Sequence, residues 1–424
     1  MKVYIHTFGC KVNSFESAAM SETLAKSGFE ILDNSAGADV VVVNSCTVTA
    51  NGDRKVAQFV RSVKRGAPDT VVVLSGCMPQ AYPQKAEAMA GVDIITGTGN
   101  RLGIAELINT YMACKYKTVS VLSGKKDFEP LGVERMDGHT RAFMKIEDGC
   151  DRYCAYCIIP YARGNVRYMS LEDIKAQADS YAKKGYREIV LSGINLSFYG
   201  RGSEIALYDA VQCAAAPDGI ERVRLGSLEP DLLPNELLTR LSSIEKLCGH
   251  FHLSLQSGCD ATLSDMRRRY DTAQFAAVAD RIRTLFPQPT FTTDVIVGFP
   301  GETEEHLAQS LRFVQSFGFL KVHVFPYSAR PGTAAADFPN QVPNPKKKRR
   351  AALMTGAADS VREKVMRQYI GRTARVIAEQ PAGGGFEGYT DHYLPALIIR
   401  EGVATGDIVN GMIQDIRDGK CIIV

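Results

Sequence analysis

The sequence predicts an α/β protein with three parts: a doubly wound parallel sheet, a partial parallel β/α barrel and a small all-β barrel. Three observations support this prediction. Strand and helix patterns alternate through the first hundred residues, and six further strand–helix units follow in the middle of the chain. The last fifty-odd residues change to short β-type segments between glycine-rich turns. A length of 424 residues also calls for two or three domains.

Composition and charge limit the classes of protein to which the chain can belong. Hydrophobic residues make up 45% and charged residues 23%, as in an ordinary soluble protein. There is no apolar run of about eighteen residues and no export signal, so we expect a cytoplasmic protein without a membrane span. In that compartment, eleven cysteines favour metal or redox chemistry over disulfides. The formal net charge of +3 is nearly neutral, so nucleic-acid binding has to come from local patches.

The first part is predicted to span residues 1–115, before a linker at 116–138, and a cysteine follows each of its first three strands. These strands are expected at Val3–Thr7, Asp39–Asn44 and Thr70–Leu74, and the cysteines are Cys10, Cys46 and Cys77. The carboxyl ends of neighbouring parallel strands share one crevice, so we expect the three thiols to converge. Each thiol also precedes a helix N-terminus, where the helix dipole favours a thiolate. Any one of them fits a buried, inert cysteine, but three at equivalent positions favour a metal cluster.

The second part, residues 139–368, contains six expected strands whose carboxyl ends form the working face of a β/α barrel. The strands are Phe143–Glu147, Glu188–Ser192, Arg222–Leu225, Phe251–Leu255, Phe291–Val297 and Leu320–Phe325. Directly after the first strand come Cys150, Cys154 and Cys157, in the spacing C-x-x-x-C-x-x-C. Three thiolates at this spacing hold three irons of a cubane [4Fe–4S] cluster and leave the fourth iron open to a small chelating molecule. A structural zinc site is disfavoured, because the next fifty residues contain no His or Cys as a fourth ligand.

The third part, residues 369–424, follows a proline-rich linker and a basic helix that begins at Lys346–Arg350. That run of five cations is either a solvated helix face or a surface that steers phosphates. The short β segments predict a small barrel similar to an OB-fold. Side chains suited to stacking and phosphate contacts with single-stranded nucleic acid are Arg372, Arg375, Tyr389, His392 and Tyr393. A purely structural barrel is the alternative.

The cysteine loop, with Tyr156 before its last cysteine, resembles the radical S-adenosylmethionine (SAM) enzymes. Together with four other motifs, the chain resembles the methylthiotransferase family of these enzymes over essentially its whole length. The motifs are Gly9-Cys10-Lys-Val-Asn13, Asn44-Ser-Cys46-Thr-Val-Thr49, Ser75-Gly-Cys77 and Asp294-Val-Ile-Val-Gly-Phe-Pro-Gly-Glu302. The family combines a three-cysteine N-terminal domain, a radical SAM barrel and a C-terminal TRAM domain that grips RNA. Lys11-Val-Asn13 after the first cysteine is similar to the MtaB-like branch, which converts N6-threonylcarbamoyladenosine in tRNA to its 2-methylthio derivative.

The resemblance implies two [4Fe–4S] clusters, one at each cysteine group, and two SAM molecules per turnover. One SAM yields the carbon radical that attacks the unactivated C2–H of adenine, and the other methylates sulfur supplied by the N-terminal cluster. The implied substrate is position 37 of the tRNA anticodon stem–loop, and the implied electron donor is a protein such as flavodoxin or ferredoxin. We expect a monomer. The alternative substrates are N6-isopentenyladenosine in tRNA and a ribosomal-protein aspartate.

No catalytic residue beyond the cluster ligands is assigned from the sequence. The resemblance implies that SAM is bound at the carboxyl ends of the barrel strands, by Ser192, Gly193, Asn195, Ser227, Glu229, Ser254 and Gln256. Arg152, Arg163 and Arg167 flank the cluster loop, and we expect them to contact the substrate or the SAM carboxylate. Two other classes of protein are disfavoured. The SAM-type loops argue against an electron-transfer protein, and cysteine groups with an open iron argue against an RNA-binding protein whose clusters are only structural.

Overall fold

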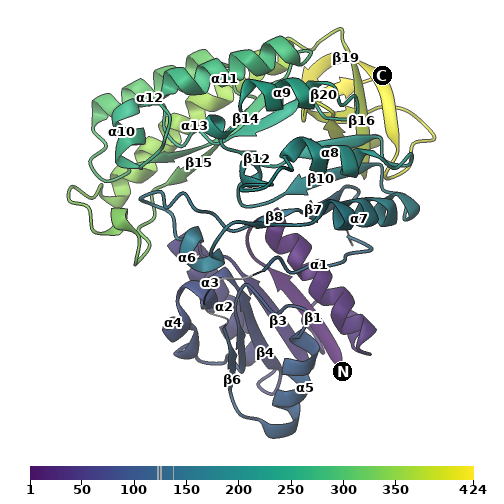
Figure 1. Ribbon diagram of the computed structural model, residues 1–424, viewed down its shortest axis with the longest axis vertical. Helices are drawn as coiled ribbons and strands as arrows, with labels where there is room; N and C mark the ends of the chain where they lie inside the picture. The colour runs from purple at the N-terminus through teal and green to yellow at the C-terminus, as the bar shows by residue number, and fades with distance from the viewer. Residues whose placement is uncertain (122–123, 125–126, 137) are drawn as a thin grey trace. The chain divides into compact units, whose positions relative to one another are not determined.

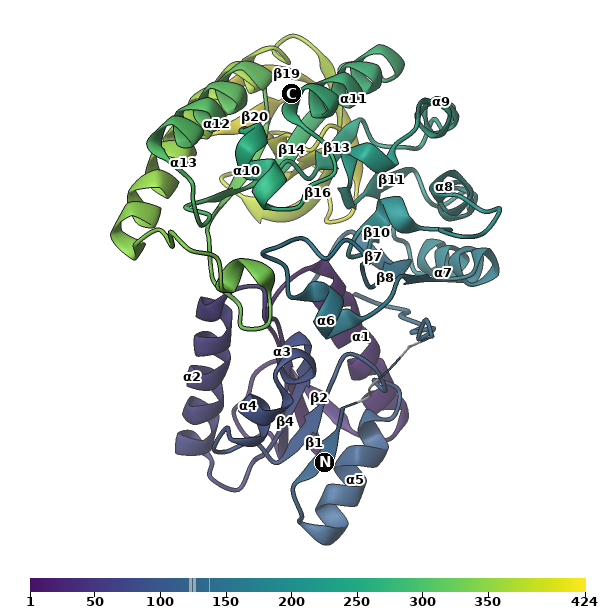
Figure 2. The same ribbon diagram turned by 60° about the vertical axis from the view of Figure 1, so that its left-hand side comes forward.

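Figures 1 and 2 show the computed structural model, which describes residues 1–121, 124, 127–136 and 138–424. Its contacts divide the chain into two compact units. The first unit comprises Met1–Asp137, Glu147–Met169 and Ser328–Ala336, and the second comprises Gly138–Ile146, Ser170–Tyr327 and Asp337–Val424. A helix with the length and apolar character of a membrane span does not occur among the described residues.

The first unit is built on a six-stranded parallel sheet in the order β2-β1-β3-β4-β5-β6. The strands are β1 (Lys2–Thr7), β2 (Glu30–Leu32), β3 (Val40–Ser45), β4 (Val71–Gly76), β5 (Ile94–Thr96) and β6 (Thr118–Ser120). The helices between them are α1 (Lys11–Lys26), α2 (Ala50–Gly66), α3 (Cys77–Ala81), α4 (Pro83–Glu87) and α5 (Ile104–Cys114). Successive side chains of a strand point to opposite faces, so Val40 and Val42 pack with α1 and α5, whereas Val41 and Val43 pack with α2, α3 and α4. Helices therefore cover both faces, which confirms the predicted doubly wound sheet (Figure 2).

Two strands of this sheet, β2 and β6, are missing from the sequence prediction. Each has three residues, and each lies at one edge of the sheet. β6 falls within the segment predicted as a linker. A three-residue strand is too short for a recognisable alternation of apolar and polar residues, and neither strand contains a fully buried side chain.

The second unit contains the predicted partial barrel as two parallel sheets, in the orders β11-β10-β7 and β12-β13-β14-β15. The strands are β7 (Ala142–Lys145), β10 (Glu188–Ser192), β11 (Arg222–Leu225), β12 (Ser227–Leu228), β13 (His250–Leu253), β14 (Thr290–Val297) and β15 (Lys321–Pro326). The intervening helices are α7 (Leu171–Lys183), α8 (Leu207–Ala215), α9 (Asn235–Ser242), α10 (Asp260–Asp265), α11 (Thr272–Leu285) and α12 (Glu304–Phe317). Because only residue 226 separates β11 from β12, the second sheet continues where the first one stops. The six predicted strand–helix units are confirmed.

A closed barrel with the strand order β16-β17-β18-β20-β19 completes the second unit. Its strands are β16 (Thr373–Ala382), β17 (Gly385–Thr390), β18 (Pro395–Ile398), β19 (Ile408–Arg417) and β20 (Lys420–Ile423). The long helix α13 (Asn344–Arg367) precedes it and contributes Val361 and Val365 to the same hydrophobic core as Val376 and Ile413 of the barrel. The predicted small all-β barrel is therefore confirmed, and it shares its core with the basic helix.

A buried ion network, here called the junction network, joins this barrel to the parallel strands of the same unit. Glu188, the first residue of β10, is fully buried and pairs with Arg222 and, at 2.8 Å, with Nε of Arg224. The two guanidinium groups donate to backbone carbonyls of the barrel, Arg222 to Arg375 at 2.8 Å and Arg224 to Thr390 at 3.0 Å. Burial by itself raises the pKa of Glu188, but the arginines outweigh it and lower the pKa to about 2.

Candidate cofactor sites

The three N-terminal cysteines follow neighbouring strands of the first unit, as predicted. Cys10 is the N-cap of α1, Cys46 follows β3 directly, and Cys77 begins α3. Their loops lie in close contact: a Cβ on Gly9 would stand 2.8 Å from Cβ of Cys46, and one on Gly76 would stand 2.4 Å from the backbone carbonyl oxygen just before Cys46. Burial, with smaller contributions from Cys46 and Cys10, raises the pKa of the Cys77 thiol to about 12. The structure thus brings the three thiols together.

Asn13 fastens two of these loops with its side-chain amide. Its Nδ2 donates to the carbonyl of Phe8 at 2.8 Å and to that of Ser45 at 3.1 Å. Its Oδ1 lies 3.8 Å from Sγ of Cys10. Asn13 therefore holds the segment before Cys10 against the segment before Cys46, so the last residue of the motif that starts at Cys10 helps to shape the cysteine site.

The second cysteine group lies in a loop between β8 (Glu147–Asp148) and α6 (Ile159–Arg163), also in the first unit. The backbone N–H of Cys150 donates to the carbonyl of Gly164 at 3.1 Å, and that of Cys157 donates to Cys154 at 2.9 Å. Burial raises the pKa of the Cys150 thiol, and the nearby Cys157 and Cys154 raise it further. These thiols are thus near neighbours, and two backbone hydrogen bonds shape their loop.

The donor sets suit iron–sulfur clusters better than single metal ions. Each group offers three cysteine sulfurs, which are soft ligands. Among the described residues, no three His, Cys, Asp or Glu side chains converge closely enough to hold one metal ion. A cubane binds each thiolate at a different iron, so its ligands stand farther apart than those of a single ion. Cys10 is exposed, and Cys46, Cys150 and Cys157 are half-buried, so a ligand can approach both groups from solvent.

The residues predicted to bind SAM lie at the carboxyl ends of strands in the second unit. Ser192 ends β10, and its hydroxyl donates to the carbonyl of Met144 at 3.2 Å. Glu229 follows β12 and pairs with Arg268 at 2.5 Å. Gln256 follows β13 with a φ of +68°. Of the others, Asn195 accepts from the Ser197 N–H at 3.2 Å, Gly193 and Ser254 directly follow β10 and β13, and Ser227 is the first residue of β12. SAM binding by these residues stays a prediction.

The five side chains predicted to contact RNA are half-buried where the structure places them. Tyr393 lies 4.5 Å from the ring of His250 and stacks on Tyr389 at 4.8 Å, both measured between centroids. Arg375 pairs with Glu221 at 2.9 Å. His392 lies 3.2 Å from the carbonyl oxygen of Pro287, and Arg372 lies over the ring of Tyr369. Tyr393, Arg375 and His392 thus contact the central part of the second unit, and the role of all five side chains in RNA binding stays a prediction.

The arginines beside the cluster loop differ from the sequence expectation. Arg163 is fully buried and Arg167 is 8% exposed, so we correct their assignment to substrate or SAM. Both pair with Asp148, Arg163 at 2.9 Å and Arg167 at 2.8 Å, and Arg163 also pairs with Glu16 of α1 at 2.9 Å. No local pattern in the sequence predicts this pair, because Glu16 and Arg163 lie 147 residues apart.

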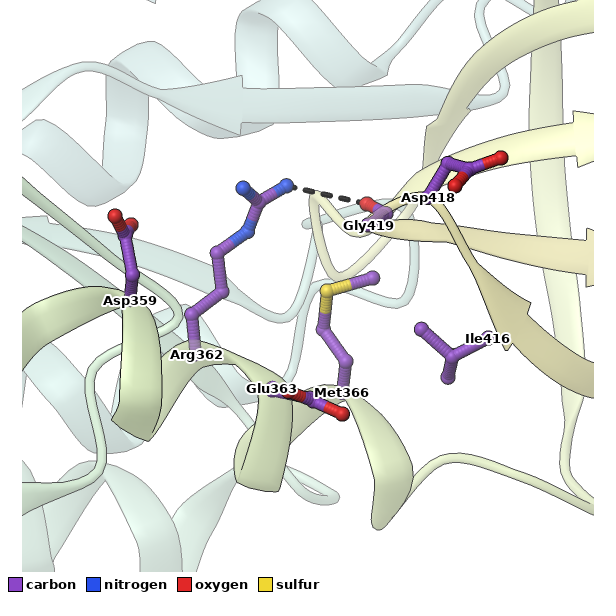
Figure 3. Close-up of a pocket in the computed structure, with 7 residues that line it drawn as sticks. All are labelled: Asp359, Arg362, Glu363, Met366, Ile416, Asp418 and Gly419. Carbon is purple, nitrogen blue, oxygen red and sulfur yellow. Dashed lines mark hydrogen bonds between the residues drawn. The ribbon is translucent and has the colours of Figure 1, made fainter. Parts of the chain in front are cut away.

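A separate hollow of about 430 Å³ lies in the second unit between α13 and the turn from β19 to β20 (Figure 3). Arg362 reaches across it and donates to the carbonyl of Gly419 at 3.2 Å. The lining residues are Asp359, Arg362, Glu363, Met366, Ile416, Asp418 and Gly419. None of these residues belongs to a predicted site, so we assign no function to the hollow.

Comparison with known families gives two matches along the chain. The model described as "Uncharacterized protein family UPF0004" matches residues 2–97, which contain the first cysteine group. The model of the Radical SAM superfamily matches residues 144–314, which contain the second group and most of the partial barrel. Each of the two matches therefore contains one of the two cysteine groups.

Most of the chain is also similar to curated proteins. It is 36% identical over 403 residues to the threonylcarbamoyladenosine tRNA methylthiotransferase MtaB of Bacillus subtilis, which covers 92% of this chain and 89% of that protein. It is 32% identical over 388 residues to the tRNA-2-methylthio-N(6)-dimethylallyladenosine synthase of Acetivibrio thermocellus, with coverages of 89% and 81%. A solved structure of the radical S-adenosylmethionine methyltransferase TsrM from Kitasatospora setae has a TM-score of 0.59 at 14% identity, covers 79% of this chain and 74% of its own, and supports the fold.

The parallel barrel strands, the C-x-x-x-C-x-x-C loop and the matching superfamily model define a radical SAM enzyme. Within that class, the chain belongs to the methylthiotransferase family, in its MtaB-like branch. It is a sulfur-inserting transferase whose cofactors are SAM and iron–sulfur clusters.

Proposed function

We propose that this enzyme converts N6-threonylcarbamoyladenosine at position 37 of tRNA to its 2-methylthio derivative. One observation carries the proposal: a single unit contains two separate three-cysteine groups. Sulfur insertion at an unactivated carbon needs one site that starts a radical and another that holds sulfur. The substrate is supported by the MtaB proteins, to which the chain is 36% identical in Bacillus subtilis and in Thermotoga maritima.

The chain's own residues hold the two cofactor sites. Cys150, Cys154 and Cys157 hold one [4Fe–4S] cluster with an open iron, and Cys10, Cys46 and Cys77 hold a second. When bound, the two clusters and two SAM molecules per turnover supply the radical, the sulfur and the methyl group that replace hydrogen at C2 of adenine. Asn13 and the glycines beside the cysteines keep the N-terminal loops close enough to share one cluster.

The residues that we propose to bind SAM and tRNA belong to the second unit. The strand-end residues that we propose to bind SAM are Ser192, Gly193, Asn195, Ser227, Glu229, Ser254 and Gln256. Gly193 leaves room for a ligand to approach the backbone closely. The C-terminal barrel binds the anticodon stem–loop, and a protein such as flavodoxin or ferredoxin supplies the electron. A monomer in the cytoplasm is part of the same proposal.

Counting irons tests the two-cluster part of the proposal. Wild-type enzyme prepared anaerobically is expected to hold about eight irons per chain, and a Cys150/Cys154/Cys157→Ala variant about four. The Cys10/Cys46/Cys77→Ala variant should also hold about four, because each group binds its own cubane. Cys114→Ala/Cys213→Ala is the matched control and should keep the wild-type content, since neither residue belongs to a group. A wild type with about four irons that falls to none in the first variant would refute the second cluster.

A direct assay tests the substrate. Reconstituted enzyme with SAM and reductant is given three anticodon stem–loops that carry unmodified, isopentenylated or threonylcarbamoylated adenosine, followed by mass spectrometry of the nucleosides. We expect methylthiolation of the threonylcarbamoyl form to exceed that of the isopentenyl form by at least about a hundredfold, because a site built for polar groups rejects an apolar analogue. Preference for the isopentenyl form would instead support the dimethylallyladenosine activity after which the Acetivibrio thermocellus relative is named. A ribosomal-protein peptide containing the aspartate serves as a fourth arm.

A further inference from the structure

One guanidinium group, that of Arg163, connects both cysteine-bearing regions of the first unit. Its side chain is fully buried. Nη1 donates to Oε1 of Glu16 and to Oδ1 of Asp148, each at 2.9 Å. Nη2 donates to Oδ1 of Asn13 at 3.0 Å and to Oε2 of Glu16 at 3.1 Å. Four hydrogen bonds therefore fix the orientation of this group.

On one side, these bonds reach the N-terminal cysteine group. Asn13 and Glu16 lie in the first two turns of α1, whose N-cap is Cys10. Asn13 also donates to the carbonyl of Ser45, next to Cys46. Helix α6, which carries Arg163, packs against α3, which begins with Cys77. The charge of Arg163 lowers the pKa of the Cys77 thiol, against the larger effect of burial.

On the other side, the same residue holds the second cysteine group. Asp148 stands two residues before Cys150 and accepts from Arg163 and Arg167. The Cys150 N–H donates to the carbonyl of Gly164, directly after Arg163, at 3.1 Å. The start of the second cysteine loop is therefore anchored at Arg163 and at the residue directly after it.

We propose that Arg163 is the positioning residue that keeps the sulfur-holding site and the radical-generating site in register, and that its charge stabilises the reduced N-terminal cluster. This inference deepens the proposed function and rests on it. Arginine is suited to the role because its planar fork donates to two carboxylates and an amide at once, whereas a lysine ammonium cannot reproduce that geometry.

A purely structural ion pair is the competing explanation, and Arg101 provides the matched control for it. Arg101 is 1% exposed and pairs with Oε2 of the same Glu16 at 2.7 Å. Its other partners are Thr98 and Glu129, neither of which adjoins a cysteine. A buried arginine on the same carboxylate can therefore be removed without a direct effect on the cysteine loops.

The first measurement is the reduction potential of the N-terminal cluster alone, by EPR-monitored titration in the Cys150/Cys154/Cys157→Ala background. We expect Arg163→Met to shift the potential to lower values, because a lost buried cation stops favouring the more negative reduced cluster. Arg163→Lys, which keeps the charge, should restore most of the shift, and Arg101→Met should leave the potential at the wild-type value. An equal shift in Arg163→Met and Arg101→Met, or no shift in either, would overturn the electrostatic role.

The second measurement tests positioning in chains with all six cysteines, through the magnetic coupling between the two reduced clusters. Arg163→Lys should change the coupling and Arg101→Lys should not, because, of these two arginines, Arg163 bonds to residues close to both cysteine groups. If Arg163→Met fails to fold, Asp148→Asn gives the same test, because it removes the charge of a carboxylate that pairs with Arg163 at 2.9 Å. An unchanged coupling in the Arg163 variants, with about eight irons bound, would refute this inference alone. A wild type with only about four irons would refute the proposed function itself.

Discussion

Glu188→Gln is expected to lower the free energy of unfolding of the second unit by about 3–5 kcal/mol. The fully buried carboxylate of Glu188 neutralises Arg222 and Arg224, and the charge of Arg141 also acts on it. Glutamine keeps the shape but removes the charge, so buried guanidinium groups lose their counter-charge. Thermal and urea unfolding followed by circular dichroism will measure the loss.

Glu221→Gln is the matched control for this substitution. Glu221 pairs at 2.9 Å with Arg375, which lies on β16 of the C-terminal barrel. The side chain of Glu221 is 29% exposed and that of Arg375 is 39% exposed. Water screens such a pair, so its loss should cost less than about 1 kcal/mol. Equal losses in the two variants would contradict the role of burial.

The same prediction has a pH signature. The pKa of Glu188 is lowered to about 2 in the folded protein, against about 4.3 for an unperturbed glutamate. A lowered pKa contributes stability above the unfolded value, and this contribution is lost as pH falls through the folded value. The difference between wild type and Glu188→Gln should therefore be constant near neutral pH and shrink from about pH 4 towards pH 2.

The cysteine groups could be predicted because one depends on a short spacing and the other on strand positions, and the sequence shows both. Cys150, Cys154 and Cys157 carry their ligand spacing within eight residues. Cys10, Cys46 and Cys77 each follow a strand, and parallel topology alone brings strand ends together. Neither prediction needs knowledge of a side-chain partner.

Contacts between distant side chains could not be predicted in this way. Glu16 and Arg163 are separated by 147 residues, and a glutamate in a helix normally faces solvent. Tyr393 suits a nucleobase and a histidine ring equally well, and the structure gives it His250. The partners of such side chains depend on tertiary contacts, which leave no periodicity in the sequence.

The predicted division of the chain at residues 115, 138 and 368 stays a prediction. It rests on local sequence patterns, whereas the grouping of segments into units depends on tertiary contacts. Residues 147–169 and 328–336 lie within the predicted central part, yet their contacts group them with the first unit. Arg330 shows the cause, since its Nη2 donates to Oγ1 of Thr47 at 2.6 Å and to Oδ2 of Asp53 at 2.8 Å. Thr47 directly follows Cys46, so this segment supports the N-terminal cysteine group.

Gly149→Ala is expected to abolish iron binding at Cys150, Cys154 and Cys157 and to reduce the iron content from about eight to about four per chain. Gly149 has a φ of +86°, and a Cβ there would stand 1.9 Å from the carbonyl oxygen of Asn165. That oxygen belongs to the backbone, so relief requires the turn after Arg163 to move. The move would pull Gly164 from the Cys150 N–H and open the loop.

Gly164→Ala separates this clash from backbone strain. Gly164 has a φ of +78°, but a Cβ there meets nothing within 4 Å. The control has a ψ of −157°, so it should cost about 1–3 kcal/mol for its positive-φ backbone and keep its iron. Iron and sulfide analysis of both variants, with circular dichroism to show that each is folded, decides between the causes. Full iron in Gly149→Ala would contradict the prediction, because it would mean that the loop adapts without losing its thiolate geometry. Equal losses of iron in the two variants would assign the effect to the backbone conformation instead of the close approach of Asn165.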